Sequence, residues 1–282
     1  MGINLNNILL QLYYNFNYEE GIRMALYFKE TGKNNTETII FLHAGMPSGW
    51  MWDKHVESLK DYHCLVPDLP EHGKSIEIKP FTMERAANEV IDIIKESAHG
   101  GKAHIVGLSL GAQVAVQIVG MAPEVVDHAV ITGALIREVG SSFSIFMNIF
   151  HKIFMRLKDI DFFIKRGMKM QSISLEYFED VKKDTKALTW SSLKNITREN
   201  GSFRIPENLC RSKNRVLVLT GEKEFKVFYE SALDLNKCLS NSKAYKVANL
   251  GHTWPLESPE LFSNVVRAWI NDNQLPDILL KL

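Results

Sequence analysis

The chain has 282 residues, 45% of them hydrophobic and 23% charged, which is ordinary for a globular protein with room for one α/β core and an insertion. The chain has 33 lysine and arginine residues and 33 aspartate and glutamate residues. This balance does not indicate a basic surface that would bind a phosphate backbone, so nucleic acid is not an expected partner. No apolar run reaches about 18 residues, so no membrane span is expected.

Residues 1–20 are predicted to form an N-terminal extension. They have neither the basic region nor the small-residue cleavage site of a secretory signal, and asparagines interrupt their apolar residues. The extension could pack on the body as an amphipathic helix, pack on a partner chain in a homodimer, or be poorly ordered. The sequence leaves these alternatives open.

The cysteines favour a reducing compartment. Cys64, Cys210 and Cys238 are odd in number, far apart, and not arranged as C-x-x-C. Neither a disulfide framework nor a cysteine zinc site is expected from this usage, and a cytoplasmic location fits it. The histidines also lack metal-ligand spacing, so no metal and no cofactor are expected.

Short apolar runs alternate with helical patterns along most of the chain, the rhythm of parallel β-α-β units. The expected strands are 23–29, 38–43, 63–67, 103–108, 129–132, 215–220 and 244–247. The expected helices are 50–60, 82–98, 110–121, 227–239 and 259–271. The pattern predicts an α/β core made of residues 21–137 and 207–282.

The central motif is Gly107-Leu108-Ser109-Leu110-Gly111, which follows a buried strand and leads into a helix rich in alanine and valine. A serine nucleophile needs such a turn, because a strained backbone lifts its Oγ above the sheet and neighbouring glycines leave it room. The following helix points its N–H groups at the reacting oxygen. This context predicts Ser109 as the nucleophile.

With this motif the chain resembles the α/β-hydrolase family, over roughly residues 21–271. The run His43-Ala44-Gly45-Met46 after an apolar strand is similar to the family's oxyanion loop. The resemblance implies that the N–H groups of Gly45 and Leu110 hold the oxyanion. Ala44 stands where the family usually has glycine, so Met46 remains a less favoured donor, and Met46 is also expected in the substrate pocket. The Ser48-Gly49-Trp50-Met51-Trp52 spacing is similar to the methylesterase and hydroxynitrile-lyase branch.

Two further polar residues are expected to be structural. His43 is expected to support the oxyanion loop. The segment 66–75 resembles the family's loop after the next strand, where the aspartate, here Asp68, ties loops together by hydrogen bonds.

The β-α rhythm stops between residues 138 and 206, which are predicted to form an inserted helical cap over the sheet. Residues 141–158 within this stretch are mainly phenylalanine, isoleucine and methionine. A helix that is apolar on most of its sides must pack against other parts of the molecule. Its aromatic residues suggest an apolar substrate, and Phe146 and Phe150 are expected to line the pocket, with Phe143 and Phe154 nearby. Packing between cap and core is the alternative for each of them.

Family order places the acid after the strand that follows the cap. Glu224 occupies that position, where the family more often has aspartate, and a glutamate can orient the imidazole equally well. Glu222 is the main rival, and Glu138 and Asp68 are remoter ones. A solvated charge in an acidic turn is the alternative reading of Glu224.

The general base is predicted to be His252. It lies in Gly251-His252-Thr253-Trp254, after the last expected parallel strand, and resembles the family's Gly-His loop. A loop at the carboxyl edge of the sheet can reach the nucleophile. Trp254 is expected to line the pocket mouth, with plain packing as the alternative.

These residues predict a carboxylesterase-like serine hydrolase that acts on a small, apolar molecule through an acyl-enzyme. The same triad could act on a thioester, amide, lactone or carbon–carbon bond, or transfer an acyl group. A weakly catalytic ligand-binding protein is the alternative from another class.

Overall fold

The computed structural model describes residues 25–137, 149 and 151–282. The predicted N-terminal extension, Glu138 and the cap aromatics Phe143, Phe146 and Phe150 lie outside the described residues.

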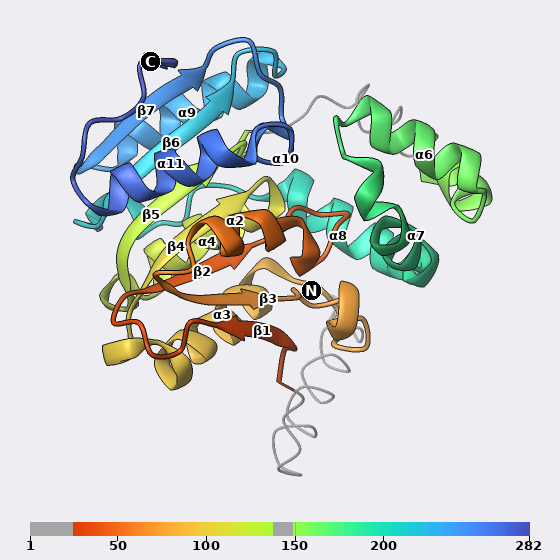
Figure 1. Ribbon diagram of the computed structural model, residues 1–282, viewed down its shortest axis with the longest axis horizontal. Helices are drawn as coiled ribbons and strands as arrows, with labels where there is room; N and C mark the ends of the chain where they lie inside the picture. The colour runs from red at the N-terminus through yellow and green to blue at the C-terminus, as the bar shows by residue number, and fades with distance from the viewer. Residues whose placement is uncertain (1–24, 138–148, 150) are drawn as a thin grey trace, which may run out of the picture.

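An eight-stranded sheet forms the centre of the molecule, in the order β1-β3-β2-β4-β5-β6-β7-β8 (Figure 1). Strands β2 to β7 are parallel, and β1 and β8 pair antiparallel at the two edges. Every residue of β2, β3 and β4 is buried, as expected for the inner strands of a parallel sheet. The strands are β1 (Phe28–Thr31), β2 (Thr38–Leu42), β3 (His63–Pro67), β4 (Ala103–Leu108), β5 (Val126–Thr132), β6 (Arg215–Gly221), β7 (Ser242–Val247) and β8 (Leu279–Lys281).

Helices cover both faces of this sheet. One face carries α3, α4 and α9, whose apolar residues share a single core cluster with the strands. The other carries α2 and α11, and aromatic residues pack on the sheet there, such as Trp52 just before α2 and Phe262 and Trp269 of α11. These helices are α2 (Asp53–Ser58), α3 (Met83–Ser97), α4 (Leu110–Met121), α9 (Lys226–Cys238), α10 (Trp254–Glu257) and α11 (Pro259–Ile270). The 3-10 turns are η1 (Gly49–Trp52), η2 (Gly73–Ser75), η3 (His99–Gly101), η4 (Pro123–Val125), η5 (Leu175–Tyr177) and η6 (Leu209–Arg211).

The predicted α/β class is confirmed, and the prediction differs from the structure mainly at the sheet edges. The predicted strands 63–67 and 103–108 and the predicted helix 110–121 have the observed bounds. The first strand spans Phe28–Thr31 rather than 23–29, and β8 was not predicted. Edge strands of three or four residues, half exposed, carry too little apolar patterning to be recognised.

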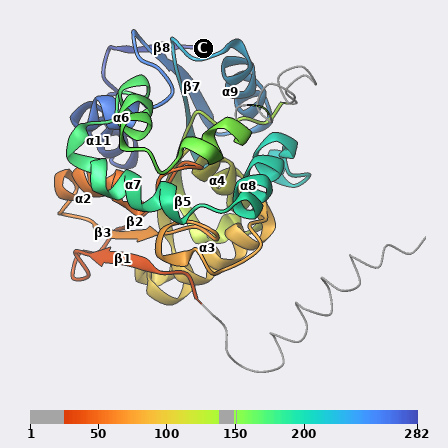
Figure 2. The same cartoon turned by 90° about the vertical axis from the view of Figure 1, so that its right-hand side faces the viewer.

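Between β5 and β6 the described chain is helical. It contains helical residues 151–157 and the three helices α6 (Asp161–Met170), α7 (Phe178–Ala187) and α8 (Trp190–Ser202), here called the cap helices. Figure 2 shows them side by side across one end of the sheet. This is the end at which β2 finishes, since Asp184 of α7 bonds to the loop that follows β2.

Two of the three cysteines form a disulfide, which corrects the expectation from the sequence. Cys210 of η6 is bonded to Cys238 at the end of α9, and Cys64 is free and buried. The two partners are 28 residues apart and meet only because α9 packs beside η6 on the same face, which spacing alone does not reveal. The cysteine usage therefore no longer supports a reducing compartment.

The described part of the chain includes no helix that is both long and apolar enough to cross a membrane. Within the same residues, no group of three or more histidine, cysteine, aspartate or glutamate side chains is arranged to hold a metal ion.

The free energy of unfolding should fall as the pH drops from 7 to 5, because several histidines are buried in neutral form. Burial lowers the pKa of His55, between α2 and α11, from 6.5 to about 3. The folded state favours neutral His55. The stability that depends on this neutral form is therefore present above pH 6.5, the ordinary pKa of histidine, and is lost as the pH falls below that value. For His55 the loss at pH 5 is about 2 kcal/mol.

Urea unfolding at both pH values would measure this loss. The difference between pH 7 and pH 5 should shrink by about that amount in His55→Gln. In His99→Gln, which replaces an exposed histidine, the difference between the two pH values should equal that of the parent protein. An unchanged difference in His55→Gln would contradict the assignment.

Candidate active site

Ser109 sits on a tight turn between β4 and α4. Its backbone has φ 55° and ψ −112°, a left-handed conformation that a non-glycine residue rarely adopts. The flanking glycines make the turn possible. A Cβ on Gly107 would lie 2.5 Å from the carbonyl oxygen of Gly111, and a Cβ on Gly111 would lie 2.1 Å from that of Leu42. The turn therefore packs directly on the end of β2.

Thr132 and Gly133, at the end of β5, link the serine turn to the histidine loop. The carbonyl of Thr132 accepts a hydrogen bond from Ser109 N at 2.9 Å. Its hydroxyl accepts one from the indole Nε1 of Trp254, also at 2.9 Å. Gly133 has φ 64°, and a Cβ there would lie 2.7 Å from Cε1 of His252. The imidazole of His252 thus packs against the backbone of Gly133, next to Thr132, whose carbonyl is bonded to Ser109.

Glu224 holds the other side of this imidazole. Its Oε2 accepts a hydrogen bond from Nδ1 of His252 at 2.9 Å, and its Oε1 accepts one from the backbone N–H of Gly221 at 2.7 Å. The Glu224 side chain is 1% exposed, and that of His252 is 33% exposed. Nδ1 therefore carries the proton, and Nε2 keeps its lone pair for a reacting hydroxyl.

The rival carboxylate has another partner. Glu222 Oε2 accepts the backbone N–H of Asn249 at 3.0 Å, and its Oε1 lies 3.7 Å from Lys246. Asp68 is occupied by the backbone N–H groups of Gly49 and Lys74, which is the structural role predicted for it.

Ser109 and His252 both contact the Thr132–Gly133 strand end. Among the described residues no hydrogen bond joins the serine hydroxyl to the imidazole. Catalytic hydrogen bonds are often long in free enzymes and tighten when substrate binds.

Gly45 and Leu110 bring two backbone donors together beside Ser109. A Cβ on Gly45 would lie 3.6 Å from Cβ of Leu110, so the two residues are in contact. In the part of the chain that the structure describes, neither N–H is paired with an acceptor. Two unpaired N–H groups beside a serine hydroxyl are what an oxyanion would require. Leu110 also opens α4, whose dipole favours negative charge at this end.

Two buried histidines shape the loop that carries Gly45. Nε2 of His43 accepts the Leu69 N–H at 2.9 Å, so its Nδ1 carries the proton and donates to the Ala44 carbonyl at 2.7 Å. Because a trans peptide points its N–H opposite its carbonyl, this bond turns the Gly45 N–H the other way. Nε2 of His72 contacts the Gly45 carbonyl at 3.1 Å. Burial lowers the pKa of both histidines.

The residues expected to line the pocket have different positions. Met46 is 42% exposed at the loop surface. Trp254 is fully buried against Phe262 and bonded to Thr132, so it supports the histidine loop from below and does not line the pocket mouth. Phe146 and Phe150 fall outside the described residues. Phe154 packs against the core as a partly buried residue.

Apolar side chains that were not predicted lie at the site. Cγ2 of Ile196, from cap helix α8, is 3.6 Å from a Cβ built on Gly45. The ring of Phe228, from α9, lies 4.8 Å from that of His252. No local motif marks either residue, because each reaches the site only through the packing of its helix.

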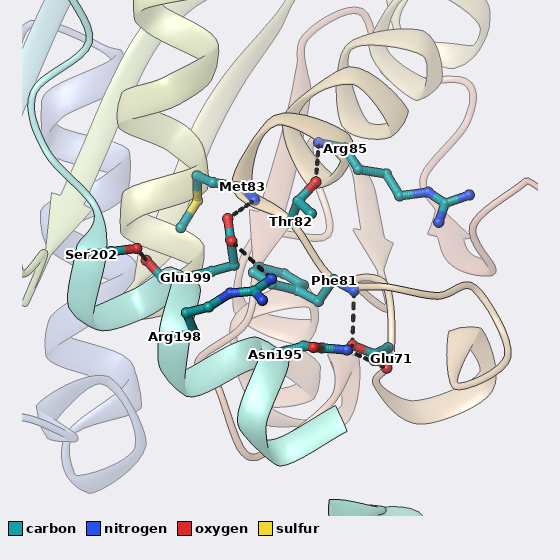
Figure 3. A network of polar contacts seen from close by, with 9 residues as sticks. All are labelled: Glu71, Phe81, Thr82, Met83, Arg85, Asn195, Arg198, Glu199 and Ser202. Atoms are coloured by element: carbon teal, nitrogen blue, oxygen red, sulfur yellow. Dashed lines mark hydrogen bonds and ion pairs between the residues drawn. The ribbon is translucent and has the colours of Figure 1, made fainter. Parts of the chain in front are cut away.

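Cap helix α8 is attached to the core by two buried or partly buried carboxylates that the sequence did not single out (Figure 3). Glu71, which is 1% exposed and has φ 62°, accepts the Phe81 N–H at 2.8 Å and the Asn195 amide at 3.0 Å. Glu199 accepts the N–H of Met83 at 2.9 Å. These bonds keep Ile196 above Gly45.

Gly133→Ala should lower turnover by about a hundredfold, because an added methyl displaces the imidazole and a misplacement of about 1 Å costs that much. The measurement is kcat for a reactive ester. Gly100→Ala is the matched control, since Gly100 has a similar φ of 65° but nothing within 4 Å of an added Cβ. Both substitutions carry a similar backbone strain of about 1–2 kcal/mol. Equal kcat values in the two variants would contradict the close contact with His252.

The chain is similar to known hydrolases over most of its length. A protein described as an AB hydrolase superfamily protein, from Gibberella zeae, is 25% identical over 269 residues, covering 93% of this chain and 89% of that protein. The 2-hydroxy-6-oxo-6-(2'-aminophenyl)hexa-2,4-dienoic acid hydrolase of Metapseudomonas resinovorans is 24% identical over 255 residues, covering 86% and 87%.

Solved structures share the fold. A thermophilic esterase from Thermogutta terrifontis superposes with a TM-score of 0.67 at 19% sequence identity, covering 88% of this chain and 93% of that one. The model of the alpha/beta hydrolase family matches residues 39–265. The chain therefore belongs to the α/β-hydrolase family, as the serine motif and its surrounding loops predicted.

Proposed function

We propose that this protein is a serine hydrolase that cleaves a carboxylic ester of a small apolar substrate through an acyl-enzyme. The observation that carries the proposal is the Glu224–His252 pair resting on Gly133, at the strand end bonded to Ser109. An acid, a base and a strained serine arranged in this chain order form the constellation of a serine hydrolase.

The proposed reaction follows from the proton positions. Nε2 of His252 takes the proton of Ser109 as Oγ attacks the ester carbonyl, and Glu224 stabilises the resulting imidazolium. The N–H groups of Gly45 and Leu110 bind the oxyanion. His252 then returns its proton to the leaving alcohol, and water, activated by the same imidazole, releases the acid.

The apolar substrate is inferred from the side chains around the reacting groups. Ile196 and Leu110 flank Gly45, and Phe228 flanks His252. An acyl or alcohol group next to these side chains would lose contact with water, and burying apolar area contributes about 25 cal/mol per Å². Two relatives that match 33% and 36% of this chain are named as esterases, which agrees with an ester as the substrate.

The test is hydrolysis of p-nitrophenyl esters of graded chain length, together with matching thioesters and anilides. The proposal predicts measurable ester hydrolysis, with kcat/KM rising from acetate to longer acyl groups. A preference of more than about tenfold for the thioester or anilide would show that the bond assignment is wrong. No turnover of any ester by folded protein would favour a binding role.

A further inference from the structure

Cap helix α7 is bonded directly to the loop that carries the proposed oxyanion donor. Oδ2 of Asp184 accepts a hydrogen bond from the backbone N–H of Ser48 at 2.8 Å and another from the indole Nε1 of Trp50, also at 2.8 Å. Both bonds end on one oxygen atom. Ser48 is three residues after Gly45, and Trp50 is the second residue of the turn η1 that follows the loop.

The rest of this loop is held from the core side. His43 binds the Ala44 carbonyl, His72 contacts the Gly45 carbonyl, and Asp68 accepts the Gly49 N–H at 2.8 Å. The bond from Ser48 to Asp184 comes between these core contacts and is made by the cap. The adjacent N–H groups of Ser48 and Gly49 therefore bond to two carboxylates from different parts of the molecule, Asp184 of α7 and Asp68 of the core.

The Asp184 carboxylate is partly enclosed at this contact, and burial raises its pKa. The contact is reinforced nearby, where the ring of Trp50 lies 4.9 Å from that of Tyr177, just before α7. A hydrogen bond in such surroundings is worth more than one in water, and a lost partner leaves buried donors unsatisfied.

The neighbouring cap helix has its own attachments. Asn195 and Glu199 join α8 to Glu71 and to the first turn of α3, on another part of the core (Figure 3). Loss of the Asp184 contact would therefore remove a support that the oxyanion loop receives from α7, while the core contacts of the loop and the attachments of α8 remain.

We propose that Asp184 is a positioning residue through which the docked cap sets the geometry of the oxyanion hole. Its single accepting oxygen holds Ser48 and Trp50, and these hold Gly45 with its N–H toward the reacting carbonyl oxygen. The inference rests on the proposed function, because it assigns Gly45 as an oxyanion donor. The cap then contributes to the chemical step and not only to substrate binding.

The test compares Asp184→Ala and Asp184→Asn in the full chain, with p-nitrophenyl acetate as substrate. The alanine variant loses the acceptor, and kcat should fall by about tenfold to a hundredfold, less than the full loss of an oxyanion donor. The asparagine variant keeps one oxygen that can accept both bonds, and its kcat should stay within about threefold of the parent. KM should change little in both, because p-nitrophenyl acetate makes few contacts with the cap.

Asp180→Ala is the matched control. Asp180 lies one turn earlier on α7, lines the same surface hollow and is exposed, and parental kcat is expected after its removal. The second readout is the inhibition constant of a trifluoromethyl ketone, whose tetrahedral adduct needs the oxyanion hole. This constant should rise in Asp184→Ala by the same factor as kcat falls.

Trp50→Phe keeps an aromatic ring near Tyr177 but removes the indole N–H that donates to Asp184, so it provides a test if Asp184→Ala fails to fold. Its kcat should fall by several-fold at unchanged melting temperature. The proposal is overturned if kcat of folded Asp184→Ala, or of Trp50→Phe where the alanine variant does not fold, stays within about twofold of the parent. It is also overturned if KM alone changes. In these cases the parent still hydrolyses the ester, whereas an inactive parent would refute the proposed function itself.

Discussion

Replacing Ser109 with alanine should lower kcat for ester hydrolysis by about 10⁴- to 10⁶-fold while leaving the fold intact. Alanine removes the nucleophilic oxygen from the turn, and its methyl group fits where the Cβ of serine already sits. The residual rate would come from the remaining oxyanion donors and from substrate binding. Steady-state kinetics with a p-nitrophenyl ester and a melting curve measure the two effects separately.

An exposed serine provides the control. Ser240→Ala, just after α9, should match the parent in both measurements. A Ser109→Ala variant that retains more than about a tenth of the parental kcat would show that another group attacks the ester.

Glu224→Gln should lower kcat by about 10⁴-fold, the loss seen when the acid of a serine triad becomes an amide. The reason is the orientation of the new side chain. The Gly221 N–H needs an acceptor at the position of Oε1, so the amide oxygen occupies that place and the NH₂ group faces His252. The imidazole must then accept at Nδ1, and its proton moves to Nε2, where it can no longer take the proton of Ser109.

Glu222→Gln is the matched control two residues earlier. Glu222 accepts a backbone N–H of the neighbouring loop, and an amide oxygen can do the same. Its kcat should stay within about threefold of the parent. If the two variants behave the other way round, Glu222 is the acid.

The turn at Ser109 could be predicted from the sequence because its constraints are local. Gly107 and Gly111 are required within two residues of Ser109, and the strand and helix that flank the turn are short, strong apolar patterns. The positions of Glu224 and His252 follow from chain order in the family, and the structure brings the two side chains to 2.9 Å.

The parts that could not be predicted depend on contacts between distant segments. Gly133 matters because His252, far along the chain, packs on its bare backbone. Asp184 meets Ser48 across an interval of 136 residues, and nothing near Asp184 in the sequence distinguishes it from the other charged residues of α7. Trp254 was expected at the pocket mouth because it is close to His252, but the short helix α10 turns it into the core.

The most direct test of the central claim, that Ser109 is the nucleophile, is mass spectrometry of the folded protein after reaction with a fluorophosphonate. The reagent phosphonylates a serine only where a base and an oxyanion hole activate it. We expect one adduct per chain, located on Ser109 by peptide mapping, with loss of ester hydrolysis in step with labelling. An active protein that gains no adduct, or carries it on a residue other than Ser109, would contradict the account.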